Sequence, residues 1–244
     1  MAQHTKNNHY IPKVLIRQFS NEAGERFYCE KGSISKKDAK KIFSASEIYD
    51  DKLEKAYNLN ESKLRNVFNE IDEKLKIKPC VLSREISIPE WNVQVYNSKD
   101  NNESVNILNE FFLRMNLKFY TANTNKDHEE ITMTREISIG GNLKNCDNIV
   151  FIRYNIDFCP FVLPVNIPVI LPVGMNIVFA TPISKDILML HYCDKNTLEN
   201  FINKYRFKHQ LNLAMIYANT PSGNMLCNFV CSDKEYAKRL IGIK

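Results

Sequence analysis

Short β-type segments dominate the stretch from Asn148 to Cys193, and they constrain the fold of this 244-residue chain more than any other feature. Proline, glycine and asparagine separate five of them, at 149–153, 161–163, 169–171, 176–180 and 187–193. Regular alternation of strands and helices, which would indicate a parallel sheet, is absent. The sequence therefore predicts an α+β fold with a mixed or antiparallel sheet of short strands.

Three main helices accompany these strands, because apolar side chains recur at intervals of three and four residues. The first follows Asn60, which is a good N-cap residue. The second covers 105–115. The third and longest begins at Asn196 or Thr197 and continues until the segment before Pro221.

Smaller elements are expected at both ends of the chain. Residues 21–25 form a turn signal, 26–30 a short strand that returns from it, and 40–44 a second strand. Near the C-terminus we expect a strand at 225–231 and a short helix at 233–241. The turn and the two strands between residues 21 and 44 predict a small hairpin-like N-terminal unit.

Composition indicates an ordinary globular protein, with 44% hydrophobic and 25% charged residues. We expect a single domain over residues 1–244, with an irregular polar connection around 120–148. No run approaches the roughly 18 apolar residues of a membrane span, and no apolar signal segment follows Met1. The sequence therefore predicts a cytoplasmic protein without membrane association.

The usual catalytic and cofactor motifs are missing. The chain has no GxGxxG, Walker, GxSxG or HExxH pattern, and its 7 glycines leave little material for a phosphate-binding loop. Its 7 cysteines form no CxxC pair and lack histidines at metal-ligand spacing, which favours buried free thiols. We expect neither a cofactor nor a metal.

One polar stretch stands out, from Lys6 to Ser20. His9 lies three residues before Pro12, which stiffens the chain, and Arg17 supplies positive charge nearby. Two interpretations are open: His9 acts as a general acid or base, or it fixes the chain end against the core by hydrogen bonds.

Arg114 is a second candidate, because it interrupts the apolar stripe of the helix expected at 105–115. An arginine in that position either extends to solvent or pairs with a buried acid. Glu61, at the start of the first helix, is a candidate partner, although an acid in a first helical turn needs no further role.

Positive charge is concentrated in one segment of a chain whose formal net charge is +5. Only Asp38 balances a group of lysines there, namely Lys31, Lys36, Lys37, Lys40 and Lys41. The last four are candidates for contact with a nucleic acid; the alternative is a solvated loop or strand face.

The run from His9 to Pro12, followed by Leu15, Arg17 and Phe19, resembles the opening of the bacterial domain of unknown function 4238 family. Members of that family begin with a His-Tyr-Val-Pro type opening and a Leu-Arg-Asn-Phe type continuation. Some members come from prophage-borne islands and are associated with defence against bacteriophage. The resemblance thus implies a bacterial anti-phage role.

The same resemblance extends along the chain and assigns supporting positions. Glu61 resembles the acidic start of a helix in the family, and Arg114 lies where members carry an arginine near the end of a helix. Asn166 belongs to a segment that many members carry as Ser-Asp-Asn-Pro, and Asn212 lies where a helix asparagine is usual. Val165 replaces the acid of that segment, and Asp157 is the nearest substitute in sequence. If the acid is catalytic in relatives, this chain is inactive or has moved the function.

Two functions therefore stay open. In the first, the protein is a metal-independent nuclease effector acting on RNA: His9 transfers the proton, Arg17 and Arg114 hold the phosphate, and Glu61 orients one of them. In the second, the protein is a non-enzymatic sensor that recognises a phage protein or other phage component. The same four residues would then form a buried polar network that locks the N-terminal segment in place.

Overall fold

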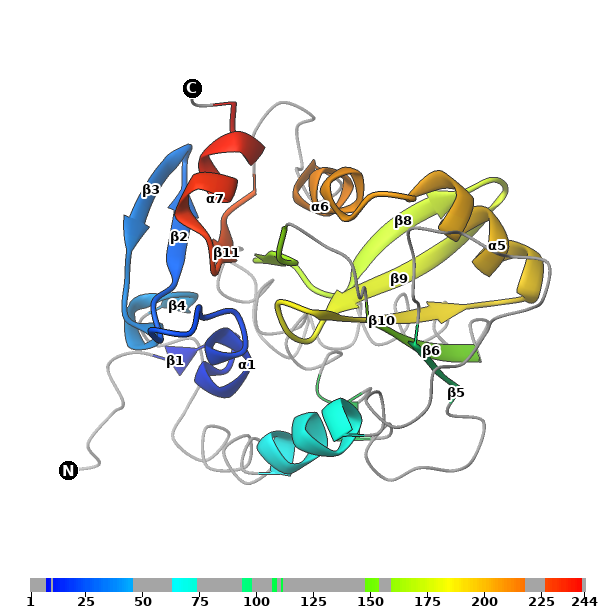
Figure 1. Ribbon diagram of the computed structural model, residues 1–244, viewed down its shortest axis with the longest axis horizontal. Coiled ribbons are helices and arrows are strands. Elements are labelled where there is room, and N and C mark those ends of the chain that lie inside the picture. The colour runs from blue at the N-terminus through cyan, green and yellow to red at the C-terminus, as the bar shows by residue number, and fades with distance from the viewer. Residues whose placement is uncertain are drawn as a thin grey trace.

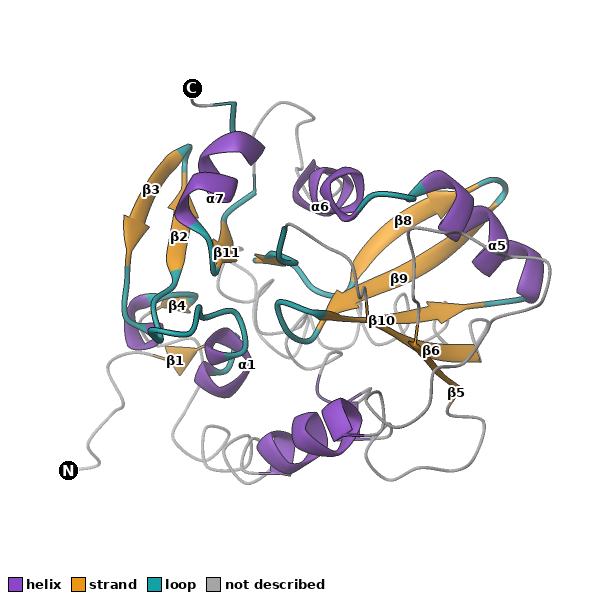
Figure 2. Ribbon diagram, viewed as in Figure 1, coloured by secondary structure: helices purple, strands orange, loops and turns teal. Residues whose placement is uncertain are grey.

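The computed structural model describes residues 8–9, 11–45, 63–73, 94–97, 107–108, 111, 148–153, 159–217 and 227–242. Its strands form a two-stranded, a four-stranded and a five-stranded sheet, and all of the described strand pairs are antiparallel (Figures 1 and 2). The α+β prediction is confirmed, in its antiparallel form.

The five-stranded sheet has the strand order β5-β6-β10-β9-β8. These strands are β5 (Gln94–Asn97), β6 (Asn148–Arg153), β8 (Val169–Val173), β9 (Asn176–Pro182) and β10 (Ile187–Tyr192). All six residues of β10 are buried, as expected for a central strand, whereas β8 at the edge alternates buried and exposed residues. The predicted β segments from 149 to 193 therefore build most of this sheet.

The four-stranded sheet joins both ends of the chain, in the order β3-β2-β11-β7. Its strands are β2 (Phe27–Glu30), β3 (Ser33–Lys36), β7 (Leu163–Pro164) and β11 (Phe229–Cys231). Lys31 and Gly32 connect β2 to β3 with φ angles of 50° and 76°, which a two-residue hairpin turn requires. The N-terminal hairpin is therefore extended by β11, a strand near the C-terminal end of the chain, which pairs with β2.

The N-terminal segment is held by a two-stranded ladder, in which β1 (Asn8–His9) pairs with β4 (Ser44–Ala45). Helix α1 (Lys13–Arg17) follows β1, and the 3-10 helix η1 (Ala39–Lys41) precedes β4. The strand expected at 40–44 is thus largely wrong. Asp38 caps η1 by accepting a 2.8 Å hydrogen bond from the Lys40 N–H, and this local bond favours a helical turn there.

The long helix expected from residue 196 is two helices, α5 (Lys195–Lys204) and α6 (Lys208–Tyr217). The chain leaves helical geometry at Tyr205. Helix α5 packs on β8 and β9, while α6 packs on β8 and α7. The N-cap is Asp194 rather than a later residue, because its carboxylate accepts a 2.7 Å hydrogen bond from the Thr197 N–H.

The remaining helices follow the prediction more closely. Residues 63–73 form a helix, and Asn60 lies outside the described residues. Helix α7 (Lys234–Leu240) is capped by Asp233, and lies beside β11 and the N-terminal hairpin (Figure 1). In the described part of the chain, no helix has the length and apolar character that a membrane crossing requires.

Buried apolar residues from both larger sheets, from α1 and from α5 to α7 belong to one hydrophobic cluster. Phe151 in β6, Phe229 in β11 and Leu15 in α1 are each completely buried in it. The irregular connection expected around 120–148 lies outside the described residues, apart from Asn148 at the start of β6.

Candidate functional site

The opening stretch is a buried anchor. His9 pairs with Ser44 in the β1–β4 ladder, and the Nε2 atom of its ring is buried. Ile11, Leu15 and Ile16, which follow it, are completely buried. The apolar side chains of this polar stretch therefore lie in the core. A catalytic role for His9 stays a prediction.

Of the four predicted catalytic residues, the structure describes only His9 and Arg17. Arg17 is exposed at the end of α1, whereas His9 lies in β1. Glu61 and Arg114 lie outside the described residues, and so does Asp157. The assignment of these residues to one catalytic site therefore stays a prediction.

Two of the four predicted nucleic-acid-binding lysines contact carboxylates. Lys36 forms an ion pair with Glu25, and Lys37 forms one with Glu30 at 3.0 Å. The Lys37 ammonium also lies 4.5 Å from the ring centroid of Tyr28. Their charges are therefore compensated on the face of the N-terminal hairpin.

The other two lysines belong to a patch that we call the α1–η1 cations, formed by Arg17, Arg26, Lys40 and Lys41. Lys40 and Lys41 are exposed in η1, which packs against α1. A backbone hydrogen bond from Lys40, together with the nearby charges of Lys40, Arg26 and Arg17, lowers the pKa of Asp38. Three cations of this patch therefore lie close enough to the exposed Asp38 carboxylate to stabilise its charge.

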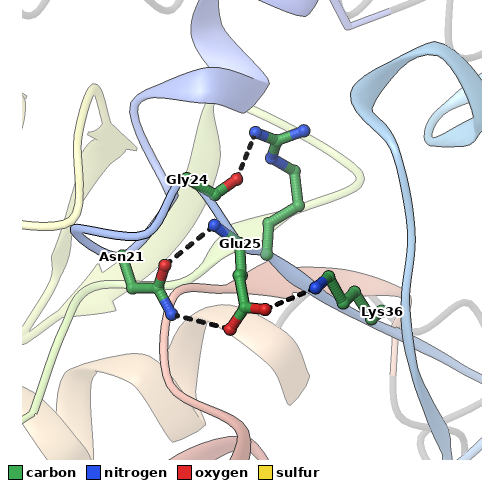
Figure 3. A network of polar contacts seen from close by, with 5 residues as sticks. Asn21, Gly24, Glu25 and Lys36 are labelled. Carbon is green, nitrogen blue, oxygen red and sulfur yellow. Dashed lines mark hydrogen bonds and ion pairs between the residues drawn. The ribbon is translucent and has the colours of Figure 1, made fainter.

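A turn network stiffens the segment between α1 and β2 (Figure 3). The Asn21 carbonyl oxygen Oδ1 accepts a 2.8 Å hydrogen bond from the Glu25 N–H, and its amide donates to the Glu25 carboxylate at 3.3 Å. Lys36 contacts the other oxygen of that carboxylate, and Arg26 donates to the Gly24 carbonyl at 2.8 Å. The contact with Lys36, followed by the hydrogen bond from the Asn21 amide, lowers the pKa of the Glu25 carboxyl.

Asn212 is a buried hub. It is completely buried in α6, where its Oδ1 accepts a 3.2 Å hydrogen bond from the Val162 N–H. Its amide donates to the Pro160 carbonyl and to the Tyr236 hydroxyl, each at 2.8 Å. Asn212 thus ties α6 to α7 and to the chain before β7, so each hydrogen bond satisfies a group that burial would otherwise leave unpaired.

Asn166, the second supporting residue, is half-buried in the bend between β7 and β8. Its neighbour Val165 is buried, and the Val165 N–H donates a 2.9 Å hydrogen bond to the Asn228 carbonyl. The position that carries an acid in the resembling family is therefore occupied here by a packed apolar side chain.

An open groove of about 840 Å³ lies where the N-terminal unit meets the C-terminal elements. Five segments line it: the 21–23 loop with Phe27 of β2, residues 159–160, the turn at 185–186 between β9 and β10, Lys208 at the start of α6, and residues 232–235 at the start of α7. Its size falls in the range of ligand sites in proteins. We call it the junction groove.

The wall of the junction groove rests on the Asn212 hub. Pro160 lines the groove and accepts from Asn212, which also bonds Tyr236. Burial is the main reason why the pKa of Tyr236 is raised strongly, so its hydroxyl stays protonated. His209 Nδ1 lies 3.3 Å from the same hydroxyl oxygen. The groove therefore has a fixed polar backing.

Two side chains of the groove carry chemistry that the sequence gave little reason to select. Lys208 is only 3% exposed although it lines the groove, and its ammonium lies 4.7 Å from the ring centroid of Phe161. Cys159 is half-buried beside Pro160. Neither lies in a motif, and only the folded chain brings them near residues 21–23.

Three of the described cysteines, Cys29, Cys227 and Cys231, are buried, whereas Cys159 and Cys193 are half-buried. The five that the structure describes are free thiols, and burial raises the pKa of Cys29 to about 11 and those of Cys227 and Cys231 to about 12. Within the described ranges, no group of three His, Cys, Asp or Glu side chains is arranged to hold a metal ion.

No protein-family model, curated protein or solved structure matches this chain. The resemblance to the domain of unknown function 4238 family, and the anti-phage role that it implies, therefore stay predictions.

Proposed function

We propose that this chain is a bacterial anti-phage defence protein that acts by binding, with the junction groove as its recognition site for a phage protein. The observation that carries the binding role is the groove itself, about 840 Å³ in volume and open to solvent. The resemblance of the opening stretch supports the defence role. As part of the proposal, we place the protein in the bacterial cytoplasm, where phage proteins are made.

The groove fits protein recognition better than RNA cleavage. Four carboxylate residues line it, namely Glu22, Asp186, Asp233 and Glu235, and all are exposed. Lys185, Lys208 and Lys234 also line the groove, but only Lys234 is exposed, so the exposed carboxylates outnumber the exposed ammonium groups and would repel the phosphates of RNA. Two of the lysines expected to attract RNA are paired with carboxylates elsewhere. A polar groove with several segments at its rim offers a protein ligand many separate contacts.

Phage infection of bacteria that produce the protein tests this proposal. We expect the wild type to lower the plating efficiency of at least one phage in a diverse panel, and Glu22→Lys/Asp186→Lys to abolish that protection. Glu199→Lys, on α5, is the control for a single charge reversal outside the groove. Circular dichroism and protein level should be the same for all three. Full protection by the double variant would refute the groove as the recognition site.

An RNA-targeting nuclease is the second candidate, and the α1–η1 cations favour it. Arg17, Arg26 and Lys40 act together on Asp38, so they form a local positive surface near the opening stretch. Such a surface suits a phosphate backbone. Total RNA after induction of wild type, His9→Ala and Arg17→Ala tests this candidate: fragmentation by the wild type alone would support it, and intact RNA in all three would refute it.

A further inference from the structure

The acidic and basic side chains that line the junction groove differ in their exposure to solvent. Lys208 is buried in the wall and Lys185 is half-buried, so Lys234 is the one fully exposed lysine among the described residues that line the groove. The four carboxylate residues of the groove are all exposed. A ligand that approaches from solvent therefore meets an acidic rim, although the chain as a whole carries a formal net charge of +5.

Two of these carboxylates are already used by α7. Asp233 accepts a 2.8 Å hydrogen bond from the Tyr236 N–H, and Glu235 forms a 2.8 Å ion pair with Lys238. The side chains of Glu22 and Asp186, by contrast, make no hydrogen bond or ion pair with any residue that the structure describes. Burial lowers the pKa of Arg153, the negative charge of nearby Asp186 opposes that shift, and the guanidinium forms its ion pair with Asp72.

Glu22 and Asp186 come from separate, stiff elements. Glu22 belongs to the Asn21–Glu25 turn, which is closed by side-chain and backbone hydrogen bonds (Figure 3). Asp186 lies in the turn between β9 and β10, where its N–H donates a 3.1 Å hydrogen bond to the Ser184 hydroxyl. The backbone that carries each carboxylate is therefore held before a ligand arrives, which reduces the backbone entropy lost on binding.

We propose that the junction groove binds an extended cationic peptide segment, whose lysine or arginine side chains contact Glu22 and Asp186. This inference rests on the proposed function, because it names the chemistry of the phage protein that the groove would recognise. The carboxylates come from segments far apart in sequence and face an open groove, an arrangement suited to successive side chains of a peptide.

Fluorescence anisotropy with defined peptides tests the inference. The probe is a fluorescein-labelled peptide of alternating arginine and serine, its opposite is the same peptide with glutamate for arginine, and spermine is the small polyamine competitor. We expect the arginine peptide to bind and the glutamate peptide not to. Binding should weaken with added salt, because ions screen exposed charges over about 10 Å at 0.1 M.

Charge-neutral variants locate the contact. Glu22→Gln/Asp186→Asn should weaken binding of the arginine peptide about tenfold, which corresponds to about 1.4 kcal/mol. Glu199→Gln removes one carboxylate from α5, outside the groove, and should leave the affinity unchanged. Absence of binding, equal binding of the glutamate peptide, or an unchanged affinity of the double variant would each overturn the inference. Displacement of the arginine peptide by spermine at equal charge concentration would also overturn the inference, because the groove would then recognise positive charge and not a peptide.

The outcome separates this inference from the proposed function. If groove variants abolish phage protection while the arginine peptide fails to bind, the groove is the recognition site and its ligand is not cationic. If the peptide binds as expected while the same variants still protect cells, the cationic site exists and the proposed function fails.

Discussion

Polar side chains make different contacts in two regions of the molecule. These are the N-terminal unit (residues 8–9 and 11–45) and the C-terminal elements (residues 159–217 and 227–242). In the N-terminal unit, polar groups meet near neighbours in sequence on the surface, as Asn21 and Lys36 do with Glu25. In the C-terminal elements, polar side chains such as Asn212 and His191 are buried among apolar ones. The difference teaches that a stretch rich in polar residues can serve mainly to pack the chain end against the core. The buried polar groups of Asn212 and His191 lie in other elements, far away in sequence.

The junction groove lies between these regions and takes residues from both. Glu22 comes from the locally closed turn, whereas Pro160 rests on the buried Asn212 hub. The comparison therefore predicts different responses to substitution: core packing should dominate in the opening stretch, and hydrogen bonds and burial of ionisable groups should dominate in the C-terminal elements.

The largest effect is expected from Leu15→Ala in the opening stretch. Leu15 is completely buried, and truncation should lower the free energy of unfolding by about 2–5 kcal/mol through lost burial and a cavity. Urea denaturation measures this loss. Val14→Ala, one residue earlier and only partly buried, is the control and should cost much less. Equal losses in the two variants would contradict the anchor role of α1.

Acid should destabilise the C-terminal elements first, through His191. Burial lowers the pKa of His191 from 6.5 to about 4, so between these values the unfolded chain binds a proton that the folded chain excludes. The free energy of unfolding should therefore fall as the pH falls from 6.5 to 4, by an amount on the order of 3 kcal/mol.

His191→Leu is the matching variant for this pH profile. Denaturation at several pH values should show a flatter slope between pH 4 and 6.5 in the variant than in the wild type. Glu25 and Asp38 of the N-terminal unit have lowered pKa values, so the stability that they add is lost mainly as the pH falls below their ordinary values of 4.5 and 3.8. An unchanged slope in the variant would assign the acid response to other groups.

Asn212→Ala should cost about 1–3 kcal/mol, because it leaves the Val162 N–H and the Tyr236 hydroxyl without their buried partner. Thermal and urea denaturation measure the loss. Asn203→Ala, at an exposed site in α5, removes the same side chain and should be nearly neutral. If the two asparagine variants were equally stable, the hub would contribute nothing to the wall of the groove.

The smallest effect is expected from Lys36→Gln. The Lys36–Glu25 ion pair is exposed, with 64% of the lysine side chain accessible, and water screens such pairs. The midpoint of thermal unfolding should stay within the error of the wild type, as it should for Lys40→Gln in η1. A clear loss for Lys36→Gln alone would show that the turn network of Figure 3 stabilises the fold more than surface pairs usually do.

Much of the fold could be predicted, because strands and caps depend on residues close in sequence. The alternation and breakers between residues 149 and 193 predicted β6, β8, β9 and β10 of the five-stranded sheet but not β5, and Asp233 at the start of α7 marked a helix that forms. The split between α5 and α6 was not predicted, because apolar residues on both sides of it, such as Phe201 and Ile216, fit one helical pattern, whereas the folded chain leaves helical geometry at Tyr205.

The candidate site could be predicted only in part. Asn212 was selected through the family resemblance, and its three hydrogen bonds join segments about 24 to 52 positions away in sequence. Lys208 and Asp186 had no motif to mark them, and they line one groove because β10, α5 and the intervening turns return the chain to the same place.

By itself, the sequence determined the α+β class and most of the main strands, because these depend on local periodicity and on apolar side chains avoiding water. Only the tertiary structure decided where charges meet. It paired Lys36 and Lys37 with carboxylates, buried Lys208, and left Glu22 and Asp186 exposed at one rim, because the energy of a charge depends on the dielectric and on the neighbours that the fold supplies.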